Sequence, residues 1–475
     1  MSYQEQLRGI VRIMKKICRV LKYGILLWLL YFVICLVIPP LYHKPPTEDA
    51  KADGINEIIN ETIHAKERIR SIDNNMDALL WRLRLIESAK DRLVLVTFDL
   101  RDDNSGRDIM AALFHAADRG VQVQILVDGI NGTLYLKNSS DFQELTSHEN
   151  VEAKLYNPID IIKPWKNNYR MHDKYLIADD FAYILGGRNT NDLFLGNYAD
   201  SYNEDRDILV YETSPGTGKS YCQLQDYFEK IWNLPCSKAY GQHDNPGKNL
   251  RTHYREVCEA YPEVLSKPEW NRETSETESI VLYTNPMEPE NKSPLLWQEM
   301  LREMKQADDI MIQTPYMICS RQMYQDLAKV CSKSGKTEVM INAVEKGSNP
   351  FGCTDYLNQK KNISKTGCSV YEYLGPQALH TKTILVDDHL SMVGSCNLDM
   401  RSVYLDTEMM LFIESKELNQ ELRNQIETLK RSSRQVLPDG TVTDGDQYQE
   451  IQLSIGKKIL YGLLRIVIIP FRHLL

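Results

Sequence analysis

The order of apolar and polar positions predicts that helices and strands alternate, and the same order occurs twice. A helical stretch beginning with LLW at 79–81 leads into the strand-like run LVLVTF at 93–98. A second helical stretch beginning with LLW at 295–297 leads into the strand-like run IMIQTPY at 310–316, and in each copy another helix and another strand follow. Because strands that alternate with helices form mixed or parallel sheets covered by helices, we expect two similar α/β lobes.

An apolar run of nineteen residues, VLKYGILLWLLYFVICLVI at 20–38, precedes the first repeat and is long enough to span a bilayer. Six basic residues lie before it or at its start, against the single acid Glu5. This bias predicts a single-pass anchor in the cell membrane, with a cytoplasmic N-terminus and the body on the outer side. A cleaved signal peptide is the alternative, but Pro39-Pro40 ends the run without a small-x-small cleavage site.

The last residues, GKKILYGLLRIVIIPFRHLL from Gly456, mix leucine and isoleucine with basic side chains. This pattern is typical of an amphipathic helix lying in the membrane interface. A core helix that packs on the second lobe is the alternative.

The chain of 475 residues is too long for one compact core, and we expect six segments. Residues 237–279 are polar, with Gly241 and Pro246, and show no sustained strand pattern. The segments are a basic cytoplasmic stretch with a transmembrane anchor at 1–39, a linker at 40–69 that passes into a helix, a first lobe at 70–236, an inter-lobe linker at 237–279, a second lobe at 280–450 and an amphipathic tail at 451–475.

Composition and charge narrow the class of function. The net charge of −9 argues against a nucleic-acid partner, because proteins that bind nucleic acids usually carry a basic surplus. Ten cysteines include no C-x-x-C pair, so the sequence predicts no structural metal site, and their spacing neither requires nor excludes disulfides.

One motif, H-x-K-x4-D-x6-G-[GS]-x-N, occurs once in each repeat. Histidine and lysine two residues apart on a strand project from the same face, so each copy presents an imidazole beside an ammonium group. The predicted catalytic residues are His172, Lys174, Asp179, His380, Lys382 and Asp387, and the predicted phosphate-binding residues are Asn189 and Asn397.

Two such faces brought together are sufficient for covalent phosphoryl transfer. One neutral histidine attacks phosphorus, while the other protonates the departing alcohol and then acts as a base on the incoming hydroxyl. The lysines, helped by the asparagines, stabilise the non-bridging oxygens, so no metal or other cofactor is required. Asp179 and Asp387 each end a strand, and we expect them to hold hairpin turns rather than to take part in the chemistry.

The paired motifs resemble the HKD signatures of the phospholipase D superfamily, and NLDMRSVYLDTE at 397–408 is similar to the second-motif region of bacterial cardiolipin synthases. The resemblance covers roughly residues 70–450. It implies an α/β fold of two fused phospholipase D-like lobes, each a mixed sheet flanked by helices, with the active site between them. It also implies a phosphohistidine intermediate and no metal. Many bacterial synthases carry two N-terminal spans, whereas this chain has one.

The resemblance further implies that a carboxylate downstream of each motif supports a catalytic imidazole. Glu408 fits after the second motif, and Asp207 aligns with it when RDILV at 206–210 is laid beside TEMML at 407–411. Asp205 competes with Asp207 for this role. Family usage favours the histidine of the first motif, His172, as the nucleophile.

The leading hypothesis is that the protein binds membrane phospholipids and joins two phosphatidylglycerols into cardiolipin with release of glycerol. A phospholipase D that hydrolyses phospholipids or exchanges their headgroups uses the same intermediate and is the first alternative. A nuclease and a non-catalytic lipid-binding protein are further alternatives, disfavoured by the charge and by the intact motifs. The sequence does not determine the acceptor alcohol or the oligomeric state.

Overall fold

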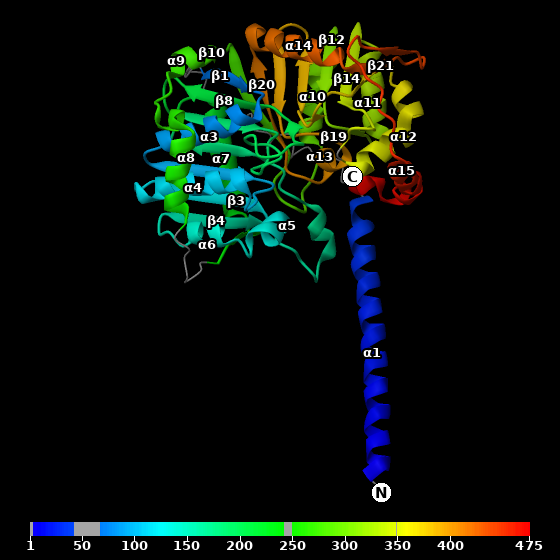
Figure 1. Ribbon diagram of the computed structural model, residues 1–475. Coiled ribbons are helices and arrows are strands. Elements are labelled where there is room, and N and C mark those ends of the chain that lie inside the picture. Colours follow the sequence, from blue (N-terminus) through cyan, green and yellow to red (C-terminus); the bar gives the residue numbers. More distant parts are fainter. Residues whose placement is uncertain (1–2, 42–66, 242–248, 348) are drawn as a thin grey trace.

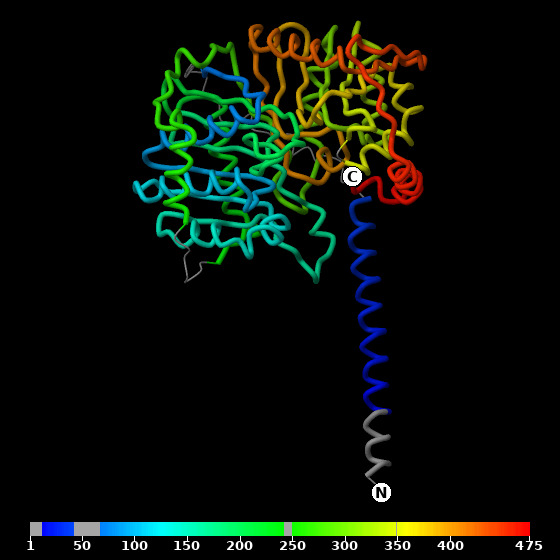
Figure 2. Tube along the Cα trace, viewed as in Figure 1, coloured from blue at the N-terminus to red at the C-terminus, as the bar shows by residue number. Residues whose placement is uncertain are grey.

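The computed structural model describes residues 3–41, 67–241, 249–347 and 349–475, with side chains from Arg12 onward. Most of the predicted linker at 40–69, including its predicted helix, lies outside the described residues. Two lobes lie side by side at one end of a long helix, α1 (Tyr3–Val37) (Figure 1). The colours of Figure 2 show that each lobe is essentially one contiguous half of the chain.

Helix α1 covers most of the segment predicted as the transmembrane anchor and is a candidate membrane span. Residues Arg12–Leu41 include an 18-residue stretch with a mean hydropathy of 2.5, which is long and apolar enough to cross a membrane. Almost none of the helix is buried against the body, which is the expected environment for a helix surrounded by lipid. The helix ends before the two prolines of a short 3-10 turn, η1 (Pro39–Leu41).

The first lobe contains a nine-stranded mixed sheet in the order β10-β1-β8-β6-β5-β2-β3-β4-β9. Strands β2, β3 and β4 are parallel, and the other neighbours are antiparallel. The strands are β1 (Glu67–Ile72), β2 (Arg92–Thr97), β3 (Gln122–Asp128), β4 (Val151–Tyr156), β5 (Tyr175–Ala178), β6 (Ala182–Gly186), β8 (Asp207–Glu212), β9 (Ser237–Ala239) and β10 (Ser275–Glu276). The helices are α3 (Asn75–Ser88), α4 (Asn104–Asp118), α5 (Gly129–Asn131), α6 (Ser140–Thr146), α7 (Lys219–Asn233), α8 (Leu250–Ala260) and α9 (Trp270–Glu273).

The second lobe repeats this arrangement in the order β11-β20-β18-β17-β12-β14-β15-β21-β22, with β12, β14 and β15 parallel. The strands are β11 (Ser279–Thr284), β12 (Asp309–Gln313), β14 (Lys336–Asn342), β15 (Ser369–Tyr373), β17 (Thr383–Val386), β18 (Leu390–Gly394), β20 (Met409–Glu414), β21 (Ser433–Val436) and β22 (Val442–Asp444). The helices are α10 (Leu295–Met304), α11 (Arg321–Cys331), α12 (Pro350–Ser364), α13 (Met400–Tyr404) and α14 (Lys416–Lys430). Four two-residue strands outside the large sheets are β7 (Asn203–Glu204), β13 (Met317–Ile318), β16 (Ala378–Leu379) and β19 (Leu398–Asp399). The predicted fold class, two α/β lobes with mixed sheets flanked by helices, is confirmed.

Local sequence explains where these elements begin and what they bury. Helices α3 and α4 start where the side chains of Asn74 and Asp103 accept hydrogen bonds from backbone N–H groups of the first turn. Strand β2 is apolar on both faces, because helices cover one face and the other lobe covers the opposite face.

Among the described residues, three apolar clusters make up the core. One lies between the first sheet and its outer helices, and a second lies between the second sheet and its outer helices. The third joins the lobes, because side chains from the inner faces of both sheets, such as Tyr183, Leu185 and Val393, pack together with α7 and α14. The two sheets therefore face each other through a common apolar layer, which fixes the relative position of the two motifs.

Residues 237–279, predicted as an inter-lobe linker, instead fold onto the first lobe where they are described. Strand β9 extends one edge of its sheet and β10 the other. Between them α8 packs on α4 and buries Leu250, Tyr254 and Val257, which follow helical spacing. In Figure 2 this green segment runs along the outer side of the first lobe. In the sequence, this short apolar stripe was not recognised because most other residues of α8 are charged or polar.

The C-terminal tail forms helix α15 (Ile455–Val467) and a 3-10 turn, η5 (Ile469–Leu474), beside the second lobe. Of α15, which is described throughout, Tyr461 alone is buried, in contact with the core cluster that includes Cys353 of α12. Most isoleucines and leucines of α15 are exposed. The structure therefore has an amphipathic tail with its apolar side outward, and not the alternative core helix.

Candidate active site

Short cross-lobe bridges bring the two motif histidines together. Met171 forms a parallel β-bridge with Thr407 of the second lobe, and the backbone N–H of His172 donates to the Thr407 carbonyl at 3.3 Å. In the same way β16 pairs with β7 of the first lobe, and the backbone N–H of His380 donates to the Glu204 carbonyl at 2.7 Å. Each histidine is therefore held by backbone of the opposite lobe.

The ring of each histidine also contacts a carboxylate of the opposite lobe. His172 Nδ1 lies 2.9 Å from Glu408 Oε1, and His380 Nδ1 lies 2.6 Å from Asp205 Oδ2. Both carboxylates are buried. An acceptor at Nδ1 fixes the tautomer of a neutral imidazole, so that the Nε2 atom of each ring is available as a nucleophile or base.

Asp207 does not have the supporting role that the sequence alignment gave it. Its Oδ2 atom lies 2.9 Å from Nη2 of Arg82 and 3.3 Å from Nη1 of Arg188, in a buried ion pair behind the sheet strand. The strand register explains the error. The equivalent glycines of the two motifs pair with Asp207 in β8 and with Met410 in β20, so the position equivalent to Glu408 is Asp205.

The two motif lysines lie beside the histidines and are buried. Lys174 Nζ donates to the carbonyl of His172, and Lys382 Nζ donates to the carbonyl of His380. Lys382 Nζ also lies 2.5 Å from His380 Nδ1, 3.2 Å from His380 Nε2 and 3.8 Å from Asp205 Oδ2. Two buried ammonium groups at one site are costly unless an anion compensates them, so the site suits a bound anion such as a phosphodiester.

Burial and the lysines make both imidazoles neutral. Burial, reinforced by the charge of Lys174, lowers the pKa of His172 well below its usual range. Burial, reinforced by Lys382, lowers the pKa of His380 to about 4, although Asp205 acts in the opposite direction. Burial also lowers the pKa of Lys174 to about 7, and the repulsion by Lys382 contributes to this shift.

The two supporting carboxylates differ in charge. Burial raises the pKa of Glu408 to about 8, even though Lys174, Ser395 and Ser402 favour its charged form. For Asp205 burial also acts to raise the pKa, but Lys382 and His380 outweigh it and hold the pKa below its usual range. Near neutral pH the Glu408–His172 pair is therefore largely uncharged, whereas the Asp205–His380 pair carries a negative charge.

The two predicted phosphate-binding asparagines occupy equivalent positions. Asn189 and Asn397 are buried, and the amide oxygen of each has no hydrogen-bond partner among the described residues. Rotation of the amide by 180° would present an NH2 donor at the same place. Asn397 Nδ2 is 3.3 Å from the hydroxyl of Tyr316.

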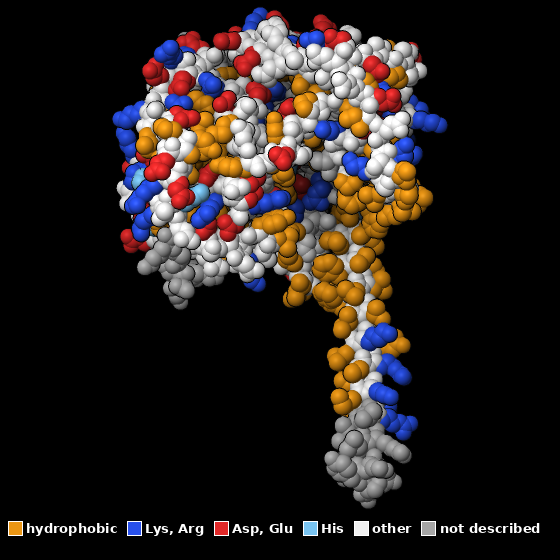
Figure 3. Space-filling view, in the orientation of Figure 1, with side chains coloured by type: hydrophobic (Ala, Val, Ile, Leu, Met, Phe, Trp, Pro, Cys, Tyr) orange, Lys and Arg blue, Asp and Glu red, His pale blue; other side chains and the backbone are white. Residues whose placement is uncertain are grey.

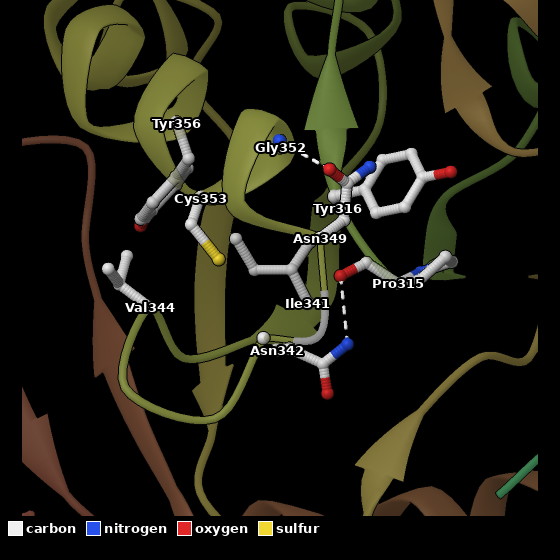
Figure 4. Close-up of a pocket in the computed structure, with 10 residues that line it drawn as sticks. Pro315, Tyr316, Ile341, Asn342, Val344, Asn349, Gly352, Cys353 and Tyr356 are labelled. Atoms are coloured by element: carbon white, nitrogen blue, oxygen red, sulfur yellow. Dashed lines mark hydrogen bonds between the residues drawn. The ribbon is translucent and has the colours of Figure 1, made fainter. Parts of the chain in front are cut away.

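Figure 4 shows Tyr316 beside Asn349 at a cavity of about 10 Å³, which is too small for a lipid headgroup.

A larger cleft, of about 390 Å³, lies between the lobes on the side of α14 and borders Asp205. Polar side chains from both lobes line much of it, including Asn75, Gln313 and Gln425. Helix α14 lies on the opposite side of the body from α1 (Figure 1). The His380 half of the site thus borders a polar cleft that faces away from the anchor.

Asp179 and Asp387, two of the predicted catalytic residues, lie away from the histidines, at the far ends of β5 and β17. Both have a positive φ, 47° and 48° respectively, in the turn to the next strand. The Asp179 carboxylate accepts hydrogen bonds from the backbone N–H groups of residues 90–92, and that of Asp387 from those of residues 308–309. They hold the hairpins, as their position before a turn indicated.

Two phenylalanines at the site were missed in the sequence. Phe98 packs edge-on against His172 and Phe194 against His380, each with ring centroids 4.9 Å apart. Phe98 directly follows β2, and Phe194 lies in the segment after the first motif, but no spacing rule relates either to a histidine. Among the described residues, no group of three His, Cys, Asp or Glu side chains is arranged to hold a metal ion.

A family model described as "Cardiolipin synthase, PLD-like domain" matches residues 83–232 and 300–430, more than half of the chain. The chain belongs to this family. Both matched regions contain one complete histidine–lysine motif, and membership in the cardiolipin synthase family makes the protein a phospholipid-modifying enzyme.

Individual relatives agree with the family match. The chain is 25% identical to cardiolipin synthase C of Escherichia coli (strain K12) over 389 residues, which cover 74% of this chain and 82% of that protein. It is 28% identical to the major cardiolipin synthase of Bacillus subtilis (strain 168) over 357 residues, which cover 72% and 64%. The solved phosphatidylserine synthase of Haemophilus influenzae Rd KW20 has a TM-score of 0.60 at 16% identity, over 87% of this chain and 98% of that chain. This last likeness shows the two-lobed fold.

Proposed function

We propose that the protein is a phosphatidyltransferase of the cardiolipin synthase type, which joins two phosphatidylglycerols and releases glycerol. The observation that carries the proposal is the crossed pairing of His172 with Glu408 and of His380 with Asp205 beside two buried lysines. Such a site suits one phosphodiester flanked by a nucleophile and an acid. Membership in the cardiolipin synthase family supports a phospholipid as the source of that phosphodiester.

The reaction proceeds in two displacements at phosphorus. In the first, Nε2 of neutral His172 attacks, a P–N bond forms and the P–O bond to glycerol breaks, while His380 donates its Nε2 proton to the leaving oxygen. In the second, His380 takes the proton from a hydroxyl of the second phosphatidylglycerol, whose oxygen attacks phosphorus as the P–N bond breaks. Both histidines return to their starting protonation states.

The unequal charges of the two pairs support His172 as the nucleophile. A nucleophilic imidazole is required in its neutral form, which the low pKa of His172 and the largely uncharged Glu408 favour. An acid is required as imidazolium, which the ionised Asp205 at 2.6 Å stabilises once the phosphodiester offsets the two lysines. Lys174, Lys382 and the two asparagines then hold the non-bridging oxygens during both displacements.

The position of the anchor supports the same assignment. Asn168 Nδ2 donates to the carbonyl of Leu36 at 2.7 Å, and Arg401 Nη2 donates to the carbonyl of Asn168 at 2.8 Å. Arg401 forms an ion pair with Asp406. The next residue, Thr407, accepts the backbone hydrogen bond from His172. A lipid attached to His172 would therefore lie on the anchor side, and glycerol could leave through the polar cleft beside Asp205. We place the N-terminus in the cytoplasm and the catalytic body at the outer face of the cell membrane.

Incubation of the purified, detergent-solubilised protein with phosphatidylglycerol tests the proposal, with chelator present and products identified by mass spectrometry. Cardiolipin and free glycerol in equal amounts are the expected products. If phosphatidic acid and glycerol form without cardiolipin, the protein is a phospholipase D and not a transferase. A matched His172→Ala preparation controls for contaminating activity, because that variant should release no glycerol.

A further inference from the structure

A short loop of the first lobe, residues 158–163, exposes three isoleucines together. Ile159, Ile161 and Ile162 are 45%, 61% and 73% exposed. The loop is nevertheless tightly built, because the Asp160 carboxylate accepts the backbone N–H groups of Ile162 and Lys163 at 2.8 Å, and Asn167 bonds both backbone groups of Asp160. A loop held in this way keeps its isoleucines directed outward.

Helix α15 of the second lobe exposes a second apolar surface. The exposed residues are Ile455, Ile459, Leu460, Leu463, Ile466 and Val467. Two of its three basic residues bond back to the body, Lys457 Nζ to the carbonyl of Glu345 and Arg465 Nε to Asn358. Part of the polar side of the helix is thus bonded to the protein, while most of its apolar side chains are exposed.

Both surfaces adjoin the upper end of α1. The Tyr31 hydroxyl donates to the carbonyl of Ile162 at 2.8 Å, and His473, in the turn after α15, lies 2.7 Å from the carbonyl of Val37. Figure 3 shows apolar side chains gathered at the base of the body around the top of this helix. The two exposed surfaces are therefore continuous with the candidate membrane span.

We propose that the loop at 158–163 and helix α15, here called the collar, are embedded in the same bilayer that α1 spans. Tyr31, which contacts the loop, lies six residues before Val37, the last residue of α1. At 1.5 Å per residue, the loop therefore meets α1 about 9 Å closer to its N-terminus than Val37. That reach matches the roughly 5–10 Å to which interfacial segments enter a membrane. Continuity with α1 favours lipid over a second copy of the chain as the partner.

The collar defines the level at which the membrane surface meets the body. With the collar in the interface, the Asn168–Arg401 connection to the His172 half lies directly above the lipid headgroups. The proposal that the collar lies in the membrane depends on α1 spanning the bilayer and does not depend on the reaction. The consequence that substrate enters directly from the bilayer rests on the proposed function.

Photocrosslinking of the full chain in nanodiscs tests the collar without requiring turnover. The discs contain phosphatidylglycerol with a diazirine in one acyl chain, and peptides carrying lipid adducts are mapped by mass spectrometry. Adducts in 158–163 and in 455–471, besides those in α1, are expected. Adducts confined to α1, or protein–protein crosslinks at these segments in place of lipid adducts, would overturn the proposal.

A double substitution, Ile161→Asp with Ile162→Asp, tests the loop separately. We expect loss of adducts in 158–163 and about a tenfold lower activity on bilayer phosphatidylglycerol, with unchanged activity on its monomeric dihexanoyl form. The control is Leu265→Asp, which changes a side chain that is 58% exposed in the turn η4 (Pro262–Leu265), packed beside α3 on the outer side of the first lobe. It should match the wild type in all three measurements. Unchanged adducts and unchanged bilayer activity in the double variant would contradict a membrane-embedded loop.

A separate observation points to a disulfide in the second lobe. The Sγ atoms of Cys331, at the end of α11, and Cys368, just before β15, lie 2.8 Å apart. We infer that a disulfide joins them when the body folds outside the cytoplasm, a location that belongs to the proposed function. The two thiols lose two protons and two electrons, an S–S bond forms, and a disulfide-bearing oxidant of that compartment is reduced to two thiols.

Peptide mapping of the membrane-isolated protein tests this bond. After an acid quench and alkylation without reductant, we expect a linked peptide that contains Cys331 and Cys368 and that separates on reduction. In a Cys331→Ser variant Cys368 should be alkylated instead. Complete alkylation of both residues in the wild-type protein would show that the bond is absent.

Discussion

His172 and Glu408 belong to different lobes, yet Nδ1 of the first lies 2.9 Å from Oε1 of the second. His380 and Asp205 cross the interface in the opposite direction at 2.6 Å. Neither lobe alone contains a complete histidine–carboxylate pair. The contact between the lobes therefore does more than bring two motifs together, because it sets the tautomer of each catalytic ring.

The crossed carboxylates should be essential as positioning residues. We expect Asp205→Asn to lower kcat by on the order of 10²–10⁴-fold with little change in KM, because an amide at this place favours the wrong tautomer of His380. Glycerol release from phosphatidylglycerol measures kcat, and thermal unfolding checks that the fold is intact. A variant with wild-type kcat would remove Asp205 from the mechanism.

Asp207 is the matched control, two residues away on the same segment. Asp207→Asn should lower the free energy of unfolding by about 3–5 kcal/mol, because it leaves Arg82 and Arg188 buried without their charge partner. The enzyme that remains folded should keep its kcat. Denaturant unfolding and activity at low temperature separate the two effects.

The hairpin aspartates should affect stability rather than chemistry. Asp179→Ala removes the acceptor for three backbone N–H groups and places a non-glycine residue without side-chain support at φ 47°. We expect a loss of about 1–3 kcal/mol in the free energy of unfolding, and a smaller loss for Asp179→Asn, which keeps one acceptor oxygen and tolerates this conformation. A fall in the kcat of the folded Asn variant would show that Asp179 acts in the chemistry.

Phosphodiester affinity should fall as pH rises above about 7. Lys174, whose pKa burial lowers to about 7, carries its charge below that pH and loses it above. A bound anion raises this pKa, so binding of glycerophosphoglycerol at pH 8 should take up a proton. Calorimetry in buffers of different ionisation enthalpy measures the uptake. Lys174→Met should lower it, and the uptake that remains belongs to His380 and Glu408. Equal affinity and no proton uptake between pH 6 and pH 8 would contradict this role.

Much of the fold follows from repeated local patterns. Continuous apolar strands and amphipathic helices recur in the same order in both halves. The histidine and lysine of each motif, expected on a strand, lie in the segment directly before β5 or β17. Helix α8 was missed because its three buried residues, Leu250, Tyr254 and Val257, are few among many charges. The membrane position of the loop at 158–163 was missed because six residues carry no periodicity.

The partners of the histidines depend on register between strands and between lobes, which no local pattern specifies. Asp205 and Asp207 are two residues apart and project from the same face of an extended segment. Only the pairing of β8 with β6 decides which of them meets His380 and which meets Arg82 and Arg188. The sequence could therefore name both candidates but not choose between them.

The most direct test of the two-histidine mechanism uses a phosphatidyl substrate with p-nitrophenol in place of glycerol. Nitrophenolate leaves without protonation, so His380→Asn should still form the phosphatidyl-enzyme but lack the base that discharges it. We predict a burst of one nitrophenolate per enzyme and a stable phosphatidyl adduct on His172, identified by mass spectrometry under alkaline conditions, with neither in His172→Asn. A burst in His172→Asn with the adduct on His380 would reverse the assignment, and no burst in either variant would contradict a phosphohistidine intermediate.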